Sequence, residues 1–421
     1  MPEVHDAGTV AAPFDQITTC RSCGSSKLEL VLDLGTTPLA DRILNDETIK
    51  QPEPVAPLTV AVCAECSLMQ IRETVAPEVL FSADYPYYSS VSEHLLKHFR
   101  GNVETVLARK KLGSNSRVVE LASNDGYLLQ NYVKLGIPVL GIDPAQGPVA
   151  EARKKGVDTR HAFFTKALAE QLVAEGIRAD VLHGNNVLAH VADTNGFVSG
   201  IAQVLKEDGL VVIECPYVRD LVDHCEFDTI YHQHLCYFSV HALDKLFRRH
   251  GLYLNHLQHV EIHGGSLRLF VEKHDAPDAS VRDMLAEEKR VGLDGVDYYR
   301  NFAARVEKFK KDLRALLEKL KSEGASIVGY GAAAKACTLM AYVGIDSKDI
   351  SCVLDRSPFK VGKRYPGNKL MIRHPDWVLD NQPDYMLLLA WNFAEEIMRQ
   401  QSEYRSRGGK FIVPIPEPVV V

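Results

Sequence analysis

The 421-residue chain lacks several features that would assign it to a specialised class of protein. It has no run of about 18 apolar residues, the length that a membrane-spanning helix needs. Its N-terminus has no basic region followed by an apolar run, as a secretory signal would. It also has no surplus of basic residues, because 48 Lys and Arg stand against 55 Asp and Glu. We therefore expect a cytoplasmic protein that binds neither nucleic acid nor a membrane.

The nine cysteines are too few and too unevenly spread for a disulfide scaffold. Apolar residues make up 46% of the chain and charged residues 24%, which is ordinary globular composition. A chain of this length exceeds what one hydrophobic core usually supports. The composition therefore predicts an ordinary globular protein of two or three domains.

Four of the nine cysteines form two C-x2-C pairs near the N-terminus, Cys20 with Cys23 and Cys63 with Cys66. Two such turns bring four thiolates to one metal ion, and a full set of four cysteines leaves no open coordination position. The alternatives are two disulfides or a redox dithiol. We expect a structural zinc ion that stabilises a short-stranded, turn-rich module, and we expect the other cysteines to be core thiols.

Beyond residue 117, short apolar strands alternate with helical segments, which predicts an α/β fold with a parallel, doubly wound sheet. A long charged helical segment covers residues 281–321, and a second, smaller Rossmann-like unit follows it. The expected order is a small N-terminal zinc-binding module (1–80), a central Rossmann-like domain (81–275) and a C-terminal Rossmann-like α/β domain (276–421).

The first strand-to-helix turn of the central unit points to a ligand that carries a ribose but no phosphate. The turn has one glycine, so it does not match the G-x-G-x-x-G pattern of dinucleotide sites. Asp143 ends the next strand and is placed to accept from ribose hydroxyls. The pattern is typical of S-adenosylmethionine (SAM) methyltransferases, and the alternative is a generic nucleotide-binding α/β domain. The expected cofactor residues are Glu120, Ala122, Ser123, Asn124, Gly126, Asp143, Asn185 and Asn186.

Residues 228–239 form the densest group of ionisable side chains. In an extended segment, His232 and His234 would point one way and Tyr231 and Gln233 the other. An imidazole is suited to remove a proton next to a carbonyl, and a tyrosine can donate to the developing oxyanion. The alternatives are a satisfied buried histidine or a His-x-His metal pair, for which no third ligand is evident.

The motifs occur in a distinctive order: the two C-x2-C pairs, E-x-x-S-N-D-G, N-V-L-A-H, F-D-T-I-Y-H-x-H, H-G-G-S-L-R and G-Y-G-A-x-A-K. In this order the chain resembles the nucleotide-sugar C-methyltransferases of deoxysugar biosynthesis, which act at C3 of 4-keto sugars. The resemblance implies a zinc module, a central SAM methyltransferase domain and a C-terminal domain that holds the nucleotide-sugar. It also implies that a base removes the proton alpha to the ketone and that the enolate attacks the SAM methyl.

By this resemblance, His234 is the general base, and Tyr231 assists at the C4 oxygen or orients the sugar. The family usually has Glu where this chain has Gln233, which can only hydrogen-bond and so puts an acid–base role there in doubt. His232 is a supporting residue. Phosphate contacts are expected at the C-terminal turn, and solvated basic residues are the alternative there. The expected substrate contacts are Tyr87, Tyr88, Ser90, His190, His263, Gly264, Gly331, Lys335, Asp355 and Lys363.

Three other functions stay open at this stage. The first is an O- or N-methyltransferase on a nucleotide-sugar or other small metabolite. The second is a zinc-containing protein that binds a nucleotide and regulates or scaffolds. A dinucleotide oxidoreductase is disfavoured by the single glycine of the first turn. The sequence does not choose between a monomer and a homodimer, and it does not identify the sugar or the nucleotide base.

Overall fold

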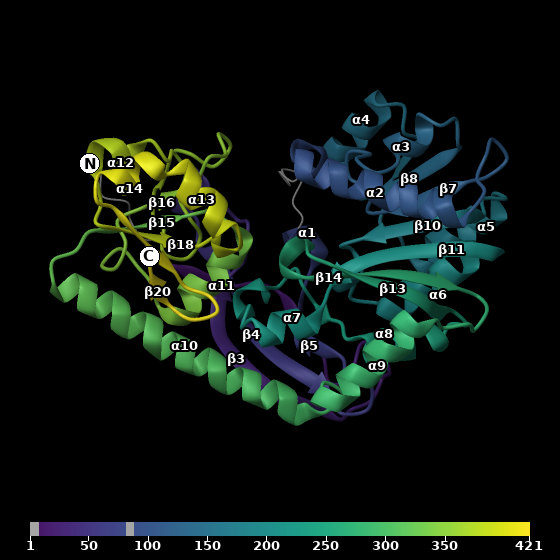
Figure 1. Cartoon of the computed structure of the whole chain (residues 1–421), viewed down its shortest axis with the longest axis horizontal. Helices are drawn as coiled ribbons and strands as arrows, with labels where there is room; N and C mark the ends of the chain where they lie inside the picture. The colour runs from purple at the N-terminus through teal and green to yellow at the C-terminus, as the bar shows by residue number, and fades with distance from the viewer. Residues whose placement is uncertain (1–7, 81–87) are drawn as a thin grey trace.

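The computed structural model describes residues 8–80 and 88–421. Figure 1 shows an N-terminal sheet between two α/β units, with the central unit on one side and the C-terminal unit on the other. One continuous apolar cluster includes Leu58 of the N-terminal sheet, Val119 of the central unit and Leu339 of the C-terminal unit. The three parts therefore share a core instead of being joined only by linkers.

The N-terminal sheet is built on two long strands, where short strands were expected. β3 (Leu28–Pro38) and β4 (Glu53–Cys63) have 11 residues each and pair antiparallel. Leu32 and Leu34 of β3 are buried while Asp33 between them is exposed, which is the period-two pattern of a half-buried strand. The sheet order is β1-β4-β5-β12, with β3 on β4, so β12 (Cys236–Tyr237) joins it from the central unit. The remaining elements here are β1 (Thr9–Ala11), β2 (Phe14–Gln16), η1 (Thr48–Lys50), β5 (Met69–Ile71), β6 (Glu73–Val75) and α1 (Pro77–Leu80).

The central sheet has the order β13-β14-β11-β10-β7-β8-β9. Its strands from β7 to β11 are parallel, but β14 pairs antiparallel with β11 and β13 antiparallel with β14. The expectation of a parallel sheet is therefore wrong at this edge. β13 and β14 are joined by a short turn at Gly264 and Gly265, a connection that only antiparallel strands allow. The strands are β7 (Val118–Leu121), β8 (Val139–Asp143), β9 (Thr159–His161), β10 (Ala179–Asn185), β11 (Leu205–Pro216), β13 (Tyr253–Val260) and β14 (Ser266–Glu272).

Helices cover this sheet, and several begin at side-chain caps. Ser92 caps α2 by accepting from the Leu95 N–H, and Ser239 caps α8 in the same way. The helices are α2 (Glu93–Arg109), α3 (Gln130–Val133), α4 (Gln146–Lys154), α5 (Lys166–Ala174), α6 (Thr194–Val204), α7 (Val218–Asp223) and α8 (Val240–Arg248). Single 3-10 turns are η2 (Ser89–Val91), η3 (Leu188–His190), η4 (Phe227–Thr229) and η5 (Ile262–Gly264).

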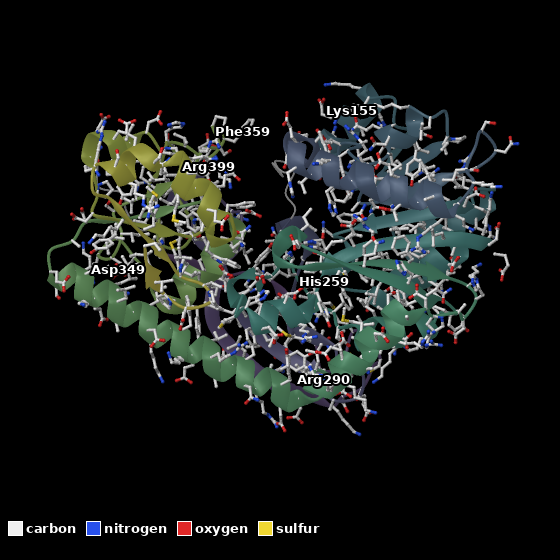
Figure 2. All side chains as sticks on the ribbon, in the orientation of Figure 1. Lys155, His259, Arg290, Asp349, Phe359 and Arg399 are labelled. Atoms are coloured by element: carbon white, nitrogen blue, oxygen red, sulfur yellow. The ribbon has the colours of Figure 1, made fainter. Side chains whose placement is uncertain are left out.

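Two helices, α9 (Ala279–Val291) and α10 (Val296–Ser322), replace the single helical segment expected over residues 281–321. The break follows Gly292, which ends α9 in the left-handed conformation with φ 78°. In Figure 1, α9 lies below the central unit and α10 extends below the C-terminal unit. Arg314 of α10 pairs with Asp349 of the C-terminal unit, labelled in Figure 2.

The C-terminal sheet has the order β17-β16-β15-β18-β19-β20, and only β20 is antiparallel to its neighbour. No helix in the described ranges is long and apolar enough to cross a bilayer. The strands are β15 (Ile327–Tyr330), β16 (Val353–Leu354), β17 (Ile372–Arg373), β18 (Tyr385–Leu388), β19 (Lys410–Val413) and β20 (Val419–Val420). The helical elements are α11 (Ala334–Val343), α12 (Trp377–Asn381), η6 (Trp391–Phe393), α13 (Ala394–Gln400) and α14 (Ser402–Ser406).

Candidate active site and zinc centre

The four cysteines of the two C-x2-C pairs converge on one point. Their Sγ atoms all lie within 4.8 Å of one another, with 3.5 Å between those of Cys20 and Cys66 and 3.4 Å between those of Cys23 and Cys63. A tetrahedral zinc ion with Zn–S bonds of about 2.3 Å sets its sulfurs about 3.8 Å apart. An all-thiolate set is also the donor chemistry that structural zinc prefers. The residues present therefore fit a structural zinc ion.

The other five cysteines are buried and do not belong to this group of four: Cys215, Cys225, Cys236, Cys337 and Cys352. Burial raises the pKa of each of these thiols above its ordinary value. They are therefore held as neutral thiols, as small core residues would be.

The turn after β7 wraps around the carboxylate of Asp143. Asn124 donates its backbone N–H to Asp143 Oδ2 at 2.8 Å, and Ala145 donates to Oδ1 at 2.8 Å. Ala122, Asn124 and Gly126 adopt left-handed backbone angles, with φ of 55°, 47° and 76°. A Cβ at Gly126 would lie 2.9 Å from Val157 Cγ2, so this position needs glycine for space as well as for conformation.

Buried polar atoms gather at the carboxyl ends of β7 and β10. Asn185 donates from Nδ2 to Glu120 Oε1 at 3.2 Å, and burial raises the pKa of Glu120 well above its ordinary value. Within the described part of the chain, five buried atoms here lack a hydrogen-bond partner: Glu120 Oε2, Ser123 Oγ, Asp125 Oδ1, Asn185 Oδ1 and Asn186 Oδ1. Buried polar groups without partners are costly, so this set fits a polar ligand such as SAM.

Tyr88 and Ser90, which are expected at the substrate, lie beside the turn after β7. The hydroxyl of Ser90 contacts Asp125, and Lys155, at the upper edge of the central unit in Figure 2, donates to Ser90 Oγ at 3.0 Å and to Asp125 Oδ2 at 2.9 Å. Tyr88 Oη is 2.7 Å from the position that a Cβ on Gly147 would take. Tyr87 lies outside the described residues.

The histidine segment is a turn, so the expected extended arrangement is wrong. His234 donates its backbone N–H to the Tyr231 carbonyl at 2.8 Å, which brings the two side chains onto one side. Tyr231 Oη and His234 Nε2 are 3.0 Å apart, with ring centroids 4.1 Å apart. His232 points the other way, where its Nε2 bonds to the Pro57 carbonyl of β4 at 2.9 Å. The turn thus separates His232 from His234 and joins Tyr231 to His234.

The hydrogen bonds of His234 fix its neutral tautomer. Nδ1 is 2.9 Å from the Thr229 carbonyl oxygen. Because a carbonyl can only accept, Nδ1 carries the proton, and Nε2 of the neutral ring holds the lone pair. The Tyr231 hydroxyl then donates to Nε2. The arrangement presents an imidazole whose basic nitrogen faces a phenol.

His190 lies beside this pair. Its ring meets that of His234 edge to face, with centroids 4.8 Å apart, and its Nδ1 bonds to the Gln233 carbonyl at 2.6 Å. Burial lowers the pKa of His190, so it is neutral next to His234. The Gln233 side chain is buried, and its Nε2 has no hydrogen-bond partner among residues 8–80 and 88–421.

The H-G-G-S turn between β13 and β14 lies against two acids. A Cβ on Gly264 would be 2.5 Å from Glu226 Oε2, and one on Gly265 would be 2.0 Å from Asp220 Oδ2. Both glycines have positive φ, 87° and 114°. The side chain of His263 lies outside the described part. This turn therefore approaches the segment that precedes the histidine turn.

In the C-terminal unit, the turn after β15 repeats the arrangement around Asp143. Ala332 donates its backbone N–H to Asp355 Oδ2 at 2.8 Å, and Ser357 donates to Oδ1 at 2.8 Å. Gly331 has φ 100°, and a Cβ there would lie 2.5 Å from Ala390 Cβ. Helix α11 begins at this turn without a side-chain cap, so its first N–H groups have no capping side chain.

Lysines lie around this turn, although not all of them face it. Lys360 Nζ donates to the Ala332 carbonyl at 2.7 Å and is 3.9 Å from Asp355 Oδ2. Lys335 Nζ donates to Asn392 Oδ1 at 2.6 Å and lies 4.2 Å from the ring centroid of Trp391. Lys363 is exposed. The turn thus collects positive charge from Lys335 and Lys360.

The sequence interpretation assigned no role to Glu226, Asp228 and Trp391. Trp391 Nε1 donates to Asp228 Oδ2 at 2.8 Å across the boundary between the central and C-terminal units. Burial raises the pKa of Glu226 to about 8 and that of Asp228 to about 6, and Lys335 opposes both shifts. The F-D-T-I motif contains Asp228, but nothing in its spacing links it to a tryptophan 163 residues away.

Three family models match consecutive parts of the chain. A zinc binding domain model matches residues 20–81, a methyltransferase domain model matches residues 92–257, and a C-methyltransferase C-terminal domain model matches residues 261–416. C-methyltransferase NovU from Streptomyces niveus is 36% identical over 416 residues, which is 98% of each chain.

Two other similarities are partial. A ubiquinone biosynthesis O-methyltransferase from Bartonella tribocorum is 29% identical over 24% of this chain and 40% of its own length. The crystal structure of magnesium protoporphyrin IX methyltransferase from Synechocystis superposes on 42% of this chain, at 15% identity and a TM-score of 0.35. By contrast, the match to NovU covers 98% of both chains. The chain therefore belongs to the family of SAM-dependent C-methyltransferases that includes NovU, and its cofactors are SAM and a structural zinc ion.

Proposed function

We propose that the protein methylates a nucleotide-linked 4-keto deoxysugar at the carbon alpha to the ketone. The observation that carries this proposal is the His234–Tyr231 pair, in which a neutral imidazole with a fixed tautomer presents its basic nitrogen beside a phenol. A ketone makes the neighbouring C–H bond acidic enough for a single positioned base. This chemistry leads to a carbanion equivalent, as transfer of a methyl group to carbon requires.

The chain's own residues perform the proton transfer. His234 Nε2 takes the proton from the alpha carbon, and the C–H electrons move into an enolate. The Tyr231 hydroxyl, released from Nε2 as it becomes protonated, donates to the C4 oxygen where negative charge develops. Neutral His190 does not oppose the imidazolium that forms on His234. When bound, SAM would supply an activated methyl group, and its sulfur would keep the electron pair of the S–CH3 bond that breaks and leave as the neutral thioether of S-adenosylhomocysteine.

The nucleotide part of the substrate is assigned to the turn after β15. The uncapped N-terminus of α11 supplies backbone N–H groups for phosphate oxygens, and Lys335 and Lys360 supply positive charge. Asp355 holds the turn and is positioned for a ribose hydroxyl, as Asp143 is in the central unit. His234 contacts His190 of the central unit, and its segment contacts α11, so the base lies where the two ligands would meet.

Deuterium exchange tests the proposal directly. A thymidine-diphosphate-linked 4-keto-6-deoxy sugar is incubated in D2O with the zinc-loaded enzyme and S-adenosylhomocysteine, which has no methyl group to transfer. We expect deuterium to enter the alpha position, as measured by mass spectrometry. His234→Asn should slow this exchange by about 10²–10⁴-fold and leave S-adenosylhomocysteine affinity unchanged in calorimetry.

His274→Asn is the matched control, because His274 is 65% exposed on the surface of the central unit. It should exchange deuterium at the rate of the unmodified enzyme. Methyl transfer to the sugar without any exchange would contradict the proposal and indicate methylation of oxygen or nitrogen instead. The proposal would also be contradicted if His234→Asn weakened cofactor affinity as much as it slowed exchange, because His234 would then hold the cofactor.

A further inference from the structure

Three consecutive residues before the histidine turn connect the candidate base to the C-terminal unit. Asp228, Thr229 and Ile230 each make one buried or half-buried hydrogen bond to a residue outside this tripeptide. The first and third bonds go to the C-terminal unit, and the middle one goes to His234. The group that fixes the imidazole is thus flanked by two anchors in another part of the molecule.

Asp228 provides the first anchor. Its side chain is fully buried, and its Oδ2 accepts from Trp391 Nε1 at 2.8 Å. Its other oxygen has no hydrogen-bond partner in the part of the chain that the structure describes, so the indole is the side-chain donor that meets this carboxylate. Trp391 is itself held by Lys335, whose Nζ lies 4.2 Å from the indole ring centroid. A buried carboxylate that loses such a donor has to move or take up a proton.

Thr338 of α11 provides the second anchor. Its hydroxyl donates to the Ile230 carbonyl at 2.6 Å, and both groups are buried. The Thr229 carbonyl between the anchors accepts from His234 Nδ1 at 2.9 Å. Because peptide units are planar, fixing the residues on both sides of Thr229 restricts the direction of its carbonyl. That direction decides which imidazole nitrogen carries the proton.

We propose that Asp228 is a positioning residue for the candidate base. Its hydrogen bond to Trp391 and the bond from Thr338 to Ile230 together hold the Thr229 carbonyl on His234 Nδ1. The proton therefore stays on Nδ1, and Nε2 remains the proton acceptor. Asp228 acts through the backbone and through His234 and takes no proton from the substrate. The catalytic meaning of this inference rests on the proposed function, but the tautomer of His234 does not.

The arrangement also joins substrate binding to the base. Trp391 and Thr338 belong to η6 and α11, and α11 begins at the turn assigned to the nucleotide. Lys335, near the start of α11, contacts both Trp391 and Asn392. The elements that hold the nucleotide would therefore also hold the Thr229 carbonyl. The tautomer of His234 thus depends on how the C-terminal unit packs against the central unit.

Trp391→Phe is the decisive variant. It removes the indole N–H but keeps an aromatic ring for Lys335, and Thr338→Val likewise removes one hydroxyl at nearly constant volume. The control is Trp377→Phe, because Trp377 lies in α12 of the same unit and packs on Arg373, with the guanidinium 5.4 Å from its ring. The chain has two tryptophans, so the pair is matched in chemistry and in domain.

In the deuterium exchange assay, Trp391→Phe should lower the exchange rate at saturating sugar about tenfold. The KM for the sugar and the affinity for S-adenosylhomocysteine should stay within about twofold of the values for the unmodified enzyme. Thr338→Val should act in the same direction, and Trp377→Phe should change neither quantity. An unchanged rate in Trp391→Phe overturns the inference. A raised KM with an unchanged rate at saturating sugar would show instead that Trp391 is a substrate contact.

A second measurement does not depend on the reaction. In the full-length zinc-loaded protein labelled with ¹⁵N-histidine, the imidazole signals of His234 are assigned by their absence in His234→Asn. We expect the unmodified protein to show the tautomer protonated at Nδ1, and Trp391→Phe to show a mixture of both tautomers. The same pure tautomer in both proteins overturns the inference, even if the enzyme proves to methylate a different substrate. Absence of deuterium exchange in the unmodified enzyme, with the tautomer shifted in Trp391→Phe, contradicts the proposed function alone.

Discussion

The turn after β7 and the turn after β15 are built alike, although they have different sequences. In each, an aspartate at the end of the neighbouring strand accepts one backbone N–H from the turn and one from two residues further along its own chain, at 2.8 Å in all four cases. Each turn also contains a glycine with positive φ where a Cβ would collide, Gly126 in the first and Gly331 in the second. The backbone device is the same in both units.

The two turns differ in the charges around them. Near the first, Glu120 and Asp125 join Asp143, and the nearby Lys155 is engaged by Asp125. Around the second, Lys335 and Lys360 approach a helix start without a side-chain cap. A site lined by carboxyl groups and neutral polar groups suits a sulfonium cation, whereas a basic site at a helix N-terminus suits phosphates. The two turns thus share one backbone geometry and differ in the side chains around it.

The largest expected effect comes from removing the zinc ligands. Cys63→Ser should lose the metal and loosen the N-terminal sheet, including the pairing of β5 with β12 next to the histidine turn. Because neither aspartate turn contacts the four cysteines, S-adenosylhomocysteine should still bind. Zinc content by mass spectrometry and affinity by calorimetry check this, with Cys352→Ser as a control that retains zinc. If cofactor affinity disappears with the metal, the turn after β7 depends on the zinc centre.

Replacing each of the two aspartates in turn by asparagine tests whether each turn binds one ligand. Asp143→Asn places an amide N–H against a backbone N–H and should weaken S-adenosylhomocysteine binding about tenfold to a hundredfold, without affecting nucleoside diphosphates. Asp355→Asn should weaken binding of the matching diphosphate among TDP, CDP and GDP by a smaller factor, since its side chain is 16% exposed, and leave the cofactor site unchanged. Calorimetry of both ligands on both variants gives four numbers. A variant that weakens both ligands equally would contradict the comparison.

The features predicted from sequence are those set by neighbouring residues. The zinc ligands follow from C-x2-C spacing, and the cofactor turn follows from a strand, a single glycine and an acid at the end of the next strand. The same local logic found Asp355. Each of these depends on the conformation of a few consecutive residues, which composition and spacing can indicate.

The features that sequence reasoning missed depend on contacts between distant segments. The antiparallel edge formed by β13 and β14 is not predicted, because the direction of a strand depends on the distant strand with which it pairs. No glycine or proline marks the turn at Tyr231, so the sequence predicts an extended segment there. The bond between Asp228 and Trp391 spans 163 residues and has no local signal. The roles assigned to individual site residues stay predictions, and the experiments on His234 and Trp391 test them.

The two lysines allow a finer comparison of the turns. Lys335→Met should weaken nucleoside diphosphate binding about tenfold and reduce its dependence on salt, because a half-buried ammonium interacts strongly with phosphate. Lys155→Met should weaken S-adenosylhomocysteine binding only a few-fold, because this lysine supports Asp125 and Ser90 at the edge of the site. Titrations at two salt concentrations measure both. Equal salt dependence of the two ligands would remove the electrostatic distinction between the turns.

The smallest expected effect concerns the acids that face Lys335. Burial raises the pKa of Glu226 to about 8 in the folded protein. The folded state therefore holds this proton more tightly than the unfolded state does, so the stability that the proton contributes is lost as the pH rises towards 8. From about pH 6.5 to pH 8 the loss amounts to about 2 kcal/mol, or a few degrees in Tm. Glu226→Gln should remove this part of the pH dependence, while Glu323→Gln on the exposed end of α10 should retain it. Thermal denaturation across this pH range measures the effect. Parallel curves of Tm against pH for Glu226→Gln and the unmodified protein would mean that Glu226 is already ionised. Lys335 would then face two negative charges and be less available for a phosphate.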